Sequence, residues 1–543
     1  MPEGNNEWVK KAAVVAGCTA LAAGGTYLVY KKYYAAPGAV TADSLKGDGN
    51  VFFQQKNYQK ALEKFDEALV QAKENEKELR AICHQNAAAC LEKLDRIPEA
   101  ILRCSDAIAL RPNYIKAIMR RANLHAILGE NEECLRDFAY VSIIDPSSKL
   151  LDKSFNTFER VHKQAVEKEF HEIMLQRSQG IDFPIPETSV LEWLCYSVVK
   201  DPVVNAVNAL KTVESQFDSI LSLIKHKKFD LVAHAAIDEL QKEDSNYKLE
   251  CMYIAARFYT FHNNPKNVKE WIDKFFDYYN SLDDATKNSD HAKAYAISAY
   301  SILSETSDSL EQAQEFVDKA KELDPQNTDP RFGFAHLAIL MKQLERAVDA
   351  LEYVIAVDKD HPYARFYLNH FEFTKACEQQ HMGNIHNHIV KMEKLVDEYP
   401  RAPIFTYTVL SNIHSNSGNF PLALEILDKG LKAYPDLSEF VMLKTLTAAK
   451  NNRSMEGNVE DMTQVFIDLC KRDPNNFEAQ ATYGKICSGK KEFDKAIESL
   501  ERAIMLARQP GELQLALQEL VLTKASREAH YLIETLNPSQ FAH

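Results

Sequence analysis

Residues 88–112, AACLEKLDRIPEAILRCSDAIALRP, contain the spacing that decides the fold. Counting from Ala88, small residues recur 12 and 19 positions later, at Ala100 and Ala107, and a proline follows 24 positions later, at Pro112. Small side chains are needed where two helices cross closely. Proline ends a helix because it has no N–H with which to continue the ladder of hydrogen bonds. The stretch therefore predicts a pair of antiparallel helices, the second of which ends just before Pro112.

The same spacing recurs along the chain. In seven units, a small residue is followed 12 and 19 positions later by further small or β-branched residues. The first residues of these units are Gly49, Ala88, Ala122, Ser301, Ala335, Ser411 and Gly484. Pro112 and Pro146 lie 34 residues apart, which is the period of the tetratricopeptide repeat (TPR). A generic helical bundle does not account for this spacing. One hairpin cannot bury its apolar face alone, so the units stack, and we expect an all-α TPR superhelical solenoid.

The repeats form two blocks, as expected for a chain of 543 residues, which is too long for a single hydrophobic core. Residues 148–246 lack the spacing and include Phe183-Pro184-Ile185-Pro186, which indicates a helical connector with a proline-rich strap. The expected parts are a short tail at 1–11, a transmembrane anchor at 12–30, a linker at 31–43, a three-repeat domain at 44–147, the connector at 148–246 and a C-terminal TPR domain at 247–543.

The anchor prediction rests on residues 12–30, AAVVAGCTALAAGGTYLVY, which carry no charge and are flanked by lysine pairs. Nineteen residues at 1.5 Å each just cross a hydrocarbon layer of about 30 Å. A cleaved secretory signal would need a small-residue cleavage site, whereas Lys31 and Lys32 follow the apolar run directly. A buried core helix is disfavoured because the segment lies outside the repeats. The lysines after the segment favour a single-pass protein whose large domain faces the cytosol.

Composition argues against several classes of function. The net charge of −14 is unsuited to a general nucleic-acid binder. The ten cysteines form no C-x-x-C pair and indicate buried thiols in a reducing compartment. Residues 484–491 resemble a phosphate-binding loop but lack the final Ser or Thr, and His381, His386 and His388 indicate a polar loop entering a helix. We therefore expect no metal, no cofactor, no nucleic acid and no catalytic residues. An enzyme is disfavoured because repeats or connector fill nearly the whole chain.

Five polar residues in the first block are predicted to converge. Lys46 and Asn50 are four residues apart on a first helix, as are Lys116 and Arg120, and Asn86 lies on the first helix between them. Residues four apart share one helix face, and the first helices of stacked units line the concave groove. The cations can hold a terminal carboxylate and a neighbouring acidic side chain, while asparagine can bond to a peptide backbone. The set predicts a site for a free peptide carboxyl terminus.

Three stretches carry a family resemblance: Lys46-Gly47-Asp48-Gly49-Asn50, Asn86-Ala87-Ala88-Ala89 and Lys116-Ala117-Ile118-Met119-Arg120. They resemble the dicarboxylate clamp of TPR co-chaperones, with all five clamp positions identical. The resemblance implies binding of the Glu-Glu-Val-Asp tails of cytosolic heat-shock chaperones of the seventy- and ninety-kilodalton classes. Anchor, clamp block, connector and second TPR block together resemble the seventy-kilodalton import receptors of the mitochondrial outer-membrane translocase.

This resemblance implies a receptor in the mitochondrial outer membrane that docks chaperones and accepts precursor proteins for import. Its expected partners are the two chaperone classes, mitochondrial precursor proteins and other translocase subunits. The alternative is a membrane-tethered TPR co-chaperone or scaffold on another organelle, in which the C-terminal block binds a fixed partner. Localisation separates these two hypotheses.

Overall fold

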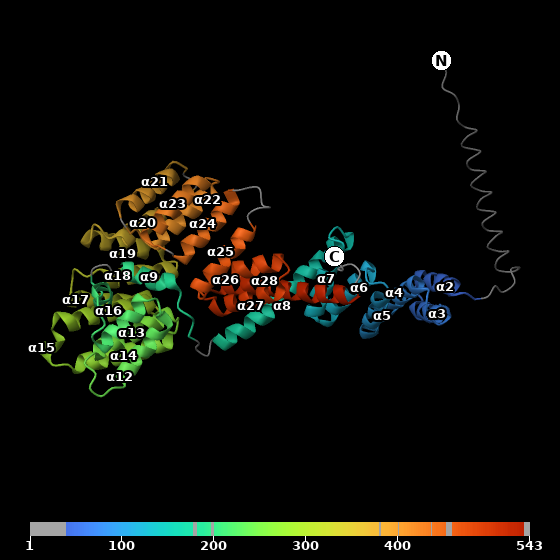
Figure 1. The fold of residues 1–543 in the computed structure, drawn as a ribbon, viewed down its shortest axis with the longest axis horizontal. Helices are drawn as coiled ribbons and strands as arrows, with labels where there is room; N and C mark the ends of the chain where they lie inside the picture. The colour runs from blue at the N-terminus through green and yellow to red at the C-terminus, as the bar shows by residue number, and fades with distance from the viewer. Residues whose placement is uncertain are drawn as a thin grey trace, which may run out of the picture. The chain divides into compact units, whose positions relative to one another are not determined.

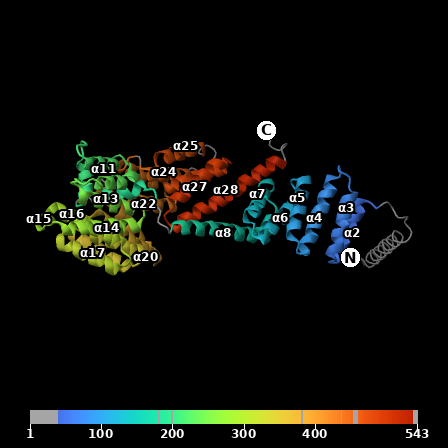
Figure 2. The same ribbon diagram turned by 90° about the horizontal axis from the view of Figure 1, so that it is seen from below.

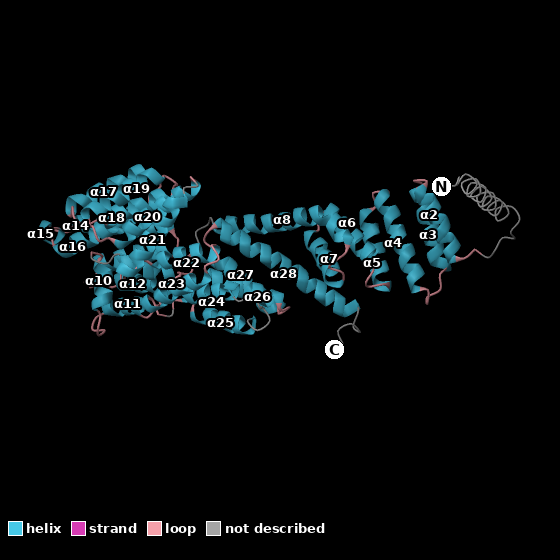
Figure 3. Ribbon diagram, turned by 90° about the horizontal axis from the view of Figure 1, so that it is seen from above, coloured by secondary structure: helices cyan, strands magenta, loops and turns pink. Residues whose placement is uncertain are grey.

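The computed structural model describes residues 40–177, 182–196, 200–379, 382–399, 401–435, 437–451 and 459–536. Within these ranges every regular element is a helix, and successive helices are joined by short turns (Figures 1 and 3). This architecture confirms the predicted all-α TPR solenoid. The chain divides into two compact units, Met1–Ala165 with Ala525–His543, and Val166–Lys524.

Three helical hairpins form most of the first unit, and each pairs a first helix with a second helix (Figure 2). The hairpin helices are α2 (Ala42–Gln54), α3 (Tyr58–Gln71), α4 (Lys77–Lys93), α5 (Ile97–Leu110), α6 (Ile115–Leu128) and α7 (Asn131–Ile144). The unit also takes in the first part of α8 (Lys149–Arg177) and the last part of α28 (Pro510–Leu536).

The small residues of the repeat spacing lie where the helices of a hairpin touch. Ala61, Ala88 and Ala100 are fully buried. At Gly49 of α2, an added Cβ would lie only 2.7 Å from the ring of Phe65 on α3. Contact this close is possible only without a side chain, which is why the spacing demands small residues.

Most turns between a first and a second helix contain one residue with left-handed backbone. Gly129 and Gly418 hold this position in two turns, with φ of 76° and 78°. Non-glycine residues hold it elsewhere, with φ between 53° and 62°: Lys56, Asp95, Lys227, Asn263, Lys342 and Lys491. Lys227 lies between α11 (Gln216–Lys225) and α12 (Val232–Leu240), so the predicted connector contains a hairpin that the sequence spacing did not indicate.

The second unit is also built of stacked helical hairpins. Before its repeats come α9 (Glu187–Tyr196), α10 (Pro202–Ala209), α11 and α12, with a short 3-10 turn at Phe229–Leu231. The next helices are α13 (Lys248–Phe261), α14 (Pro265–Ser281), α15 (Asp284–Lys287), α16 (Asp290–Thr306), α17 (Leu310–Leu323), α18 (Asp329–Leu340) and α19 (Leu344–Val357). The last are α20 (Pro362–Glu378), α21 (Met382–Glu398), α22 (Ile404–Asn416), α23 (Phe420–Ala433), α24 (Ser438–Asn451), α25 (Val459–Arg472), α26 (Phe477–Gly489), α27 (Phe493–Leu506) and the start of α28.

Helix α9 packs within the second unit. Its Val190 and Trp193 are buried in the core around α13, while Leu191 packs against the core around α22 and α23. The buried carboxylate of Asp201 caps α10 by accepting from the Val203 N–H at 2.9 Å, and it also accepts from Trp193 Nε1 at 3.2 Å. The helix is therefore held by both apolar and polar contacts.

The proline-rich strap precedes α9 and is tied to α13. The Phe183 N–H donates to the His262 carbonyl at 2.9 Å, and His262 Nδ1 lies 2.8 Å from the Phe183 carbonyl oxygen. Arg508 donates from Nη2 to the Pro184 carbonyl at 2.7 Å. The strap thus links the start and the end of the second unit.

The predicted transmembrane anchor, residues 12–30, lies outside the described residues. Among the helices that the structure does describe, none combines the length and the apolar character needed to cross a membrane.

Candidate peptide-binding site

The five predicted clamp residues lie on the first helices of the three hairpins in the first unit. Lys46 and Asn50 are on α2, Asn86 is on α4, and Lys116 and Arg120 are on α6. Helix α4 packs beside both α2 and α6, so the three first helices are neighbours. Stacking therefore brings side chains from three separate repeats to the same side of the unit.

A cavity of about 540 Å³ lies along α4 and α6 and receives three of the five residues: Asn86, Lys116 and Arg120. Asn50 does not line the cavity but joins the cluster, because its Oδ1 accepts from Asn86 Nδ2 at 3.1 Å. Lys46 does not line it either, and its Nζ lies 2.6 Å from Asp43 Oδ1. The structure thus brings four of the five residues together and leaves the fifth paired at the start of α2.

The cations of the cavity differ in their partners. Arg120 forms an ion pair with Glu92, which lies near the end of α4 and also lines the cavity. Within the described residues, Lys116 is exposed and has no ion-pair partner. The Nε of Arg120 is buried and has no hydrogen-bond acceptor in the described part of the chain. A carboxylate ligand could pair with the Lys116 ammonium and accept a hydrogen bond from Arg120 Nε.

The neighbouring Arg121 has a different environment. Its side chain is 9% exposed and forms two hydrogen bonds with the fully buried Asp137, from Nε at 2.7 Å and from Nη2 at 2.8 Å. The pair joins α6 to α7. Arg121 therefore stabilises the hairpin, whereas Arg120 faces the cavity.

Several cavity residues were missed by the sequence analysis. The ones beyond the predicted set are Phe53, Gln85, Ala89, Glu92, Met119, Asn123, Leu124, Ile127, Leu150 and Ser154. Helical spacing would have found some of them, because Ala89 lies three residues after Asn86 and Asn123 three after Arg120. The pairing of Glu92 with Arg120 joins residues 28 apart on different helices, and no local pattern signals it.

The second unit has its own cavity of about 410 Å³, lined by the first helices α22, α24 and α26 and by residues 186–189. Its charged groups are mainly carboxylates: Glu187, Glu439, Asp473, Glu478 and Glu512, with Arg508. Burial raises the pKa of Asp473 to about 6, and burial also raises the pKa values of Glu439 and Glu478. This cavity would favour a cationic segment that neutralises the acidic groups.

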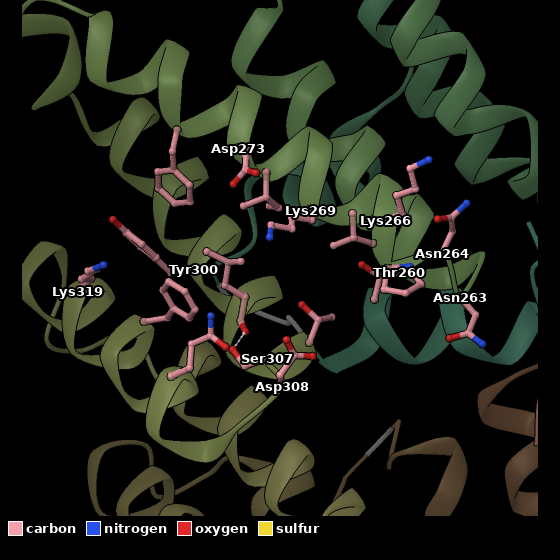
Figure 4. A pocket seen from close by; sticks show the side chains of 18 of the residues that line it. Thr260, Asn263, Asn264, Lys266, Lys269, Asp273, Tyr300, Ser307, Asp308 and Lys319 are labelled. Atoms are coloured by element: carbon pink, nitrogen blue, oxygen red, sulfur yellow. Dashed lines mark hydrogen bonds between the residues drawn. The ribbon is translucent and has the colours of Figure 1, made fainter. Parts of the chain in front are cut away.

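A larger cavity of about 800 Å³ lies along the second helices α14 and α17. Figure 4 shows Lys266, Lys269 and Asp273 on α14, with Tyr300 and Lys319 on the opposing helices. Charges of both signs line this cavity. It is bounded chiefly by second helices and so is distinct from the first-helix groove expected to hold peptides.

The predicted absence of a metal site concerned three histidines. His386 and His388 lie within α21, so the expected helix includes both of them, while His381 lies outside the described residues. Among the described residues, no group of three or more His, Cys, Asp or Glu side chains has the geometry of a metal site.

The chain resembles known proteins over different lengths. Residues 477–510, which span α26 and α27, match the family model described as tetratricopeptide repeat. Mitochondrial import receptor subunit TOM70 of Homo sapiens is 22% identical over 484 residues, covering 87% of this chain and 77% of its own. Mitochondrial import receptor subunit tomm-70 of Caenorhabditis elegans is 21% identical, covering 98% and 99%.

The crystal structure of yeast Tom70 has the same fold. It aligns with a TM-score of 0.50 at 18% identity and covers 92% of this chain and 99% of that one. Sequence similarity and fold both extend over most of the chain. The chain is therefore homologous to the TOM70 mitochondrial import receptors.

Proposed function

We propose that this chain is a mitochondrial import receptor that docks cytosolic heat-shock chaperones by their Glu-Glu-Val-Asp tails and accepts precursor proteins. Homology over most of the chain to proteins named as mitochondrial import receptor subunits supports the receptor role. The observation that carries the docking role is the cavity of the first unit, where Asn86, Lys116 and Arg120 converge from two first helices.

Recognition of the tail rests on charge and on backbone hydrogen bonds. Arg120 offers a planar guanidinium that can hold a carboxylate at two points, and the exposed Lys116 ammonium can hold a second carboxylate. The Asn50–Asn86 pair keeps amide groups beside the cations, and these can donate to and accept from a peptide backbone. Phe53, Met119 and Ile127 add apolar surface for the remaining side chains of the tail.

Precursor binding is assigned to the second unit. Its cavity is lined by the first helices α22, α24 and α26, and the proposed chaperone site is lined by first helices too. The charged groups of this cavity are mainly carboxylates, whereas Lys116 and Arg120 of the chaperone site are cations. Such a surface selects basic segments, whereas the first unit selects acidic tails. The two cavities would therefore bind chaperone and precursor without competing for one ligand.

The chain is proposed to reside in the outer membrane of the mitochondrion through residues 12–30, with both units in the cytosol. The alternative is a membrane-tethered co-chaperone or scaffold on another organelle. Fusing residues 1–43 to a fluorescent reporter separates the two, because only the first hypothesis expects mitochondrial labelling.

Titration calorimetry of the full chain tests the docking role. A synthetic peptide ending in Glu-Glu-Val-Asp should bind, and the same peptide with an amidated carboxyl terminus should bind at least about tenfold more weakly, because one of its carboxylates is removed. Equal binding of the two peptides would contradict recognition of the carboxyl terminus. Rising salt should weaken binding of the first peptide, since charge pairs at a partly exposed groove are screened.

A further inference from the structure

The Arg120 side chain already contacts a carboxylate when no ligand is present. Its Nη1 donates to Oε2 of Glu92, a residue 28 positions earlier on α4. Both side chains are about three-quarters buried, with exposures of 26% and 28%, and both line the same cavity. Glu92 therefore occupies the position of an acidic ligand group with respect to Arg120.

This arrangement leaves Arg120 incompletely satisfied. Its Nε–H is buried without an acceptor among the described residues. A buried donor without a partner destabilises the conformation that hides it. The Glu92 carboxylate thus holds Arg120 without satisfying all of its donors. A ligand carboxylate that also accepts from Nε could replace Glu92.

Glu92 itself has a second partner. Its other oxygen, Oε1, lies 3.8 Å from Nζ of Lys93. When Arg120 turns to a ligand, the Glu92 carboxylate keeps a neighbouring positive charge and some contact with water. An exchange of partners by Arg120 therefore does not leave an isolated charge behind.

We infer that Glu92 is an intramolecular competitor for the ligand carboxylate at the clamp, and that it sets how acidic a peptide end must be to bind. This inference rests on the proposed function of the first unit as a carboxyl-terminal peptide clamp. In the free protein Glu92 occupies Arg120. A peptide must displace it and must also approach a site that carries one more negative charge.

This competition separates ligands by their charge. A peptide end with a single carboxylate gains from Arg120 little more than Glu92 already provides. An end with two or more carboxylates also engages Lys116, which has no ion-pair partner within the described residues. The cost of displacing Glu92 therefore leaves a single-carboxylate end with little net affinity, whereas an end with several acidic groups keeps the contribution of Lys116.

The variant Glu92→Gln tests the inference in the full chain. It removes the competing charge and keeps the shape of the side chain. The dissociation constant of the Glu-Glu-Val-Asp peptide should fall about threefold to fivefold, the range expected for a partly exposed ion pair. A peptide ending in a single carboxylate, Gly-Gly-Val-Gly, should also bind more tightly to this variant than to the parent, because it no longer has to displace Glu92 from Arg120.

The matched control is Glu67→Gln, which removes one negative charge from the same unit on α3. Glu67 pairs with Lys64 at 2.6 Å and does not line the cavity. This variant should leave the affinity within about 1.5-fold of the parent, because its charge is remote and screened. An equal gain in affinity in both variants would mean that the effect comes from the net charge of the unit alone, and it would overturn the inference.

A second comparison uses Arg120→Ala as the background. If Glu92 acts through Arg120, adding Glu92→Gln to Arg120→Ala should give less than half of the gain, on a logarithmic scale, that it gives in the parent. Unchanged or weaker binding by Glu92→Gln alone would mean that Glu92 positions Arg120 for the ligand and would overturn competition. If the parent itself does not bind the peptide, the proposed clamp fails first, so the two failures are distinguishable.

Discussion

Two adjacent arginines on α6 lie in different environments within a single helical turn. Arg120 faces the cavity and pairs with Glu92, which is exposed to a similar degree. Arg121 faces α7 and pairs with Asp137, which is fully buried. Neighbours in a helix point about 100° apart, so substitutions at these two positions should affect different measurements.

Arg120→Ala should nearly abolish binding of the chaperone tail and leave the fold intact. Truncating one partner of a desolvated charge pair costs about 2–5 kcal/mol, which is about 30-fold or more in affinity. Titration calorimetry with the tail peptide measures the loss, and far-UV circular dichroism checks the fold.

The comparison variant for this prediction is Arg103→Ala, which removes a cation from α5. Arg103 pairs with Asp66 at 2.6 Å and does not line the cavity. Its removal should change tail affinity by less than about twofold, because surface ion pairs contribute roughly 0–1 kcal/mol. Tail binding by Arg120→Ala within twofold of the parent would show that the clamp assignment is wrong.

Arg121→Met, in contrast to Arg120→Ala, should lower the stability of the first unit. Removing Arg121 leaves the buried Asp137 carboxylate with the longer contacts from Arg136, from Nη2 at 3.3 Å and from Nε at 3.4 Å. Breaking a buried pair destabilises a protein by roughly 3–5 kcal/mol. Hydrogen exchange at the amides of α6 and α7 should quicken accordingly, and the double variant Arg121→Met with Asp137→Leu should recover much of the protection. Unchanged exchange in Arg121→Met would refute a structural role for the pair.

Within an element, the repeat spacing makes different demands on two glycines of α2. A Cβ at Gly49 would lie 2.7 Å from the Phe65 ring, whereas a Cβ at Gly47 would meet nothing within 4 Å. Gly49→Ala should destabilise the first hairpin by about 1 kcal/mol, because crowding of about 1–3 kcal/mol exceeds the gain in helix propensity. Gly47→Ala should stabilise it by about 1 kcal/mol. Hydrogen exchange of α2 and α3 measures both, and equal effects would contradict the close crossing.

Helix α9 gives the second unit a dependence on pH. Burial, with a smaller contribution from the nearby Glu439 carboxylate, raises the pKa of Glu192 to about 7. The folded state therefore holds a proton that the unfolded state has already lost above about pH 4.5. Stability contributed by this proton is present below about pH 4.5 and is lost as the pH rises to about 7.

Glu192→Gln should therefore stabilise the protein at pH 8, by about 2 kcal/mol, and should have little effect at pH 4. Melting temperatures at the two pH values measure the difference. Glu187→Gln provides the control on the same helix, because Glu187 is paired with Lys227 and should give no such gain. A gain for Glu192→Gln that is equal at pH 4 and pH 8 would rule out titration as its cause.

For the chain as a whole, the predicted anchor can be separated from the folded units. Deleting residues 1–32 should release the protein from membranes without loss of helix, because the first described helix, α2, begins at Ala42. Alkaline extraction of membranes and circular dichroism check the two parts of the prediction. A truncated chain that remains in the membrane fraction would show that another segment provides the attachment.

The architecture was largely predictable from the sequence because TPR packing repeats. Each hairpin places small residues at the same crossing points, and the resulting spacing at Gly49, Ala88 and their counterparts is visible without a structure. The candidate clamp residues could be proposed for a similar reason, since residues four apart share one face of a first helix. Both features depend on residues close together along the chain, so they can be predicted from the local sequence pattern.

Other features depended on which helix faces meet. The hairpin of α11 and α12 lacks the small-residue spacing, and the packing of α9 against α13 and α22 joins segments far apart in the chain. Arg120 meets Glu92 because α4 and α6 stack, and Arg121 meets Asp137 because α6 and α7 cross. The sequence by itself determined the repeating helices and the candidate clamp. Only the tertiary structure decided how each of these charges is paired. The pairs form between different helices, and the periodicity of residues along one helix does not predict which side chains of another helix lie opposite.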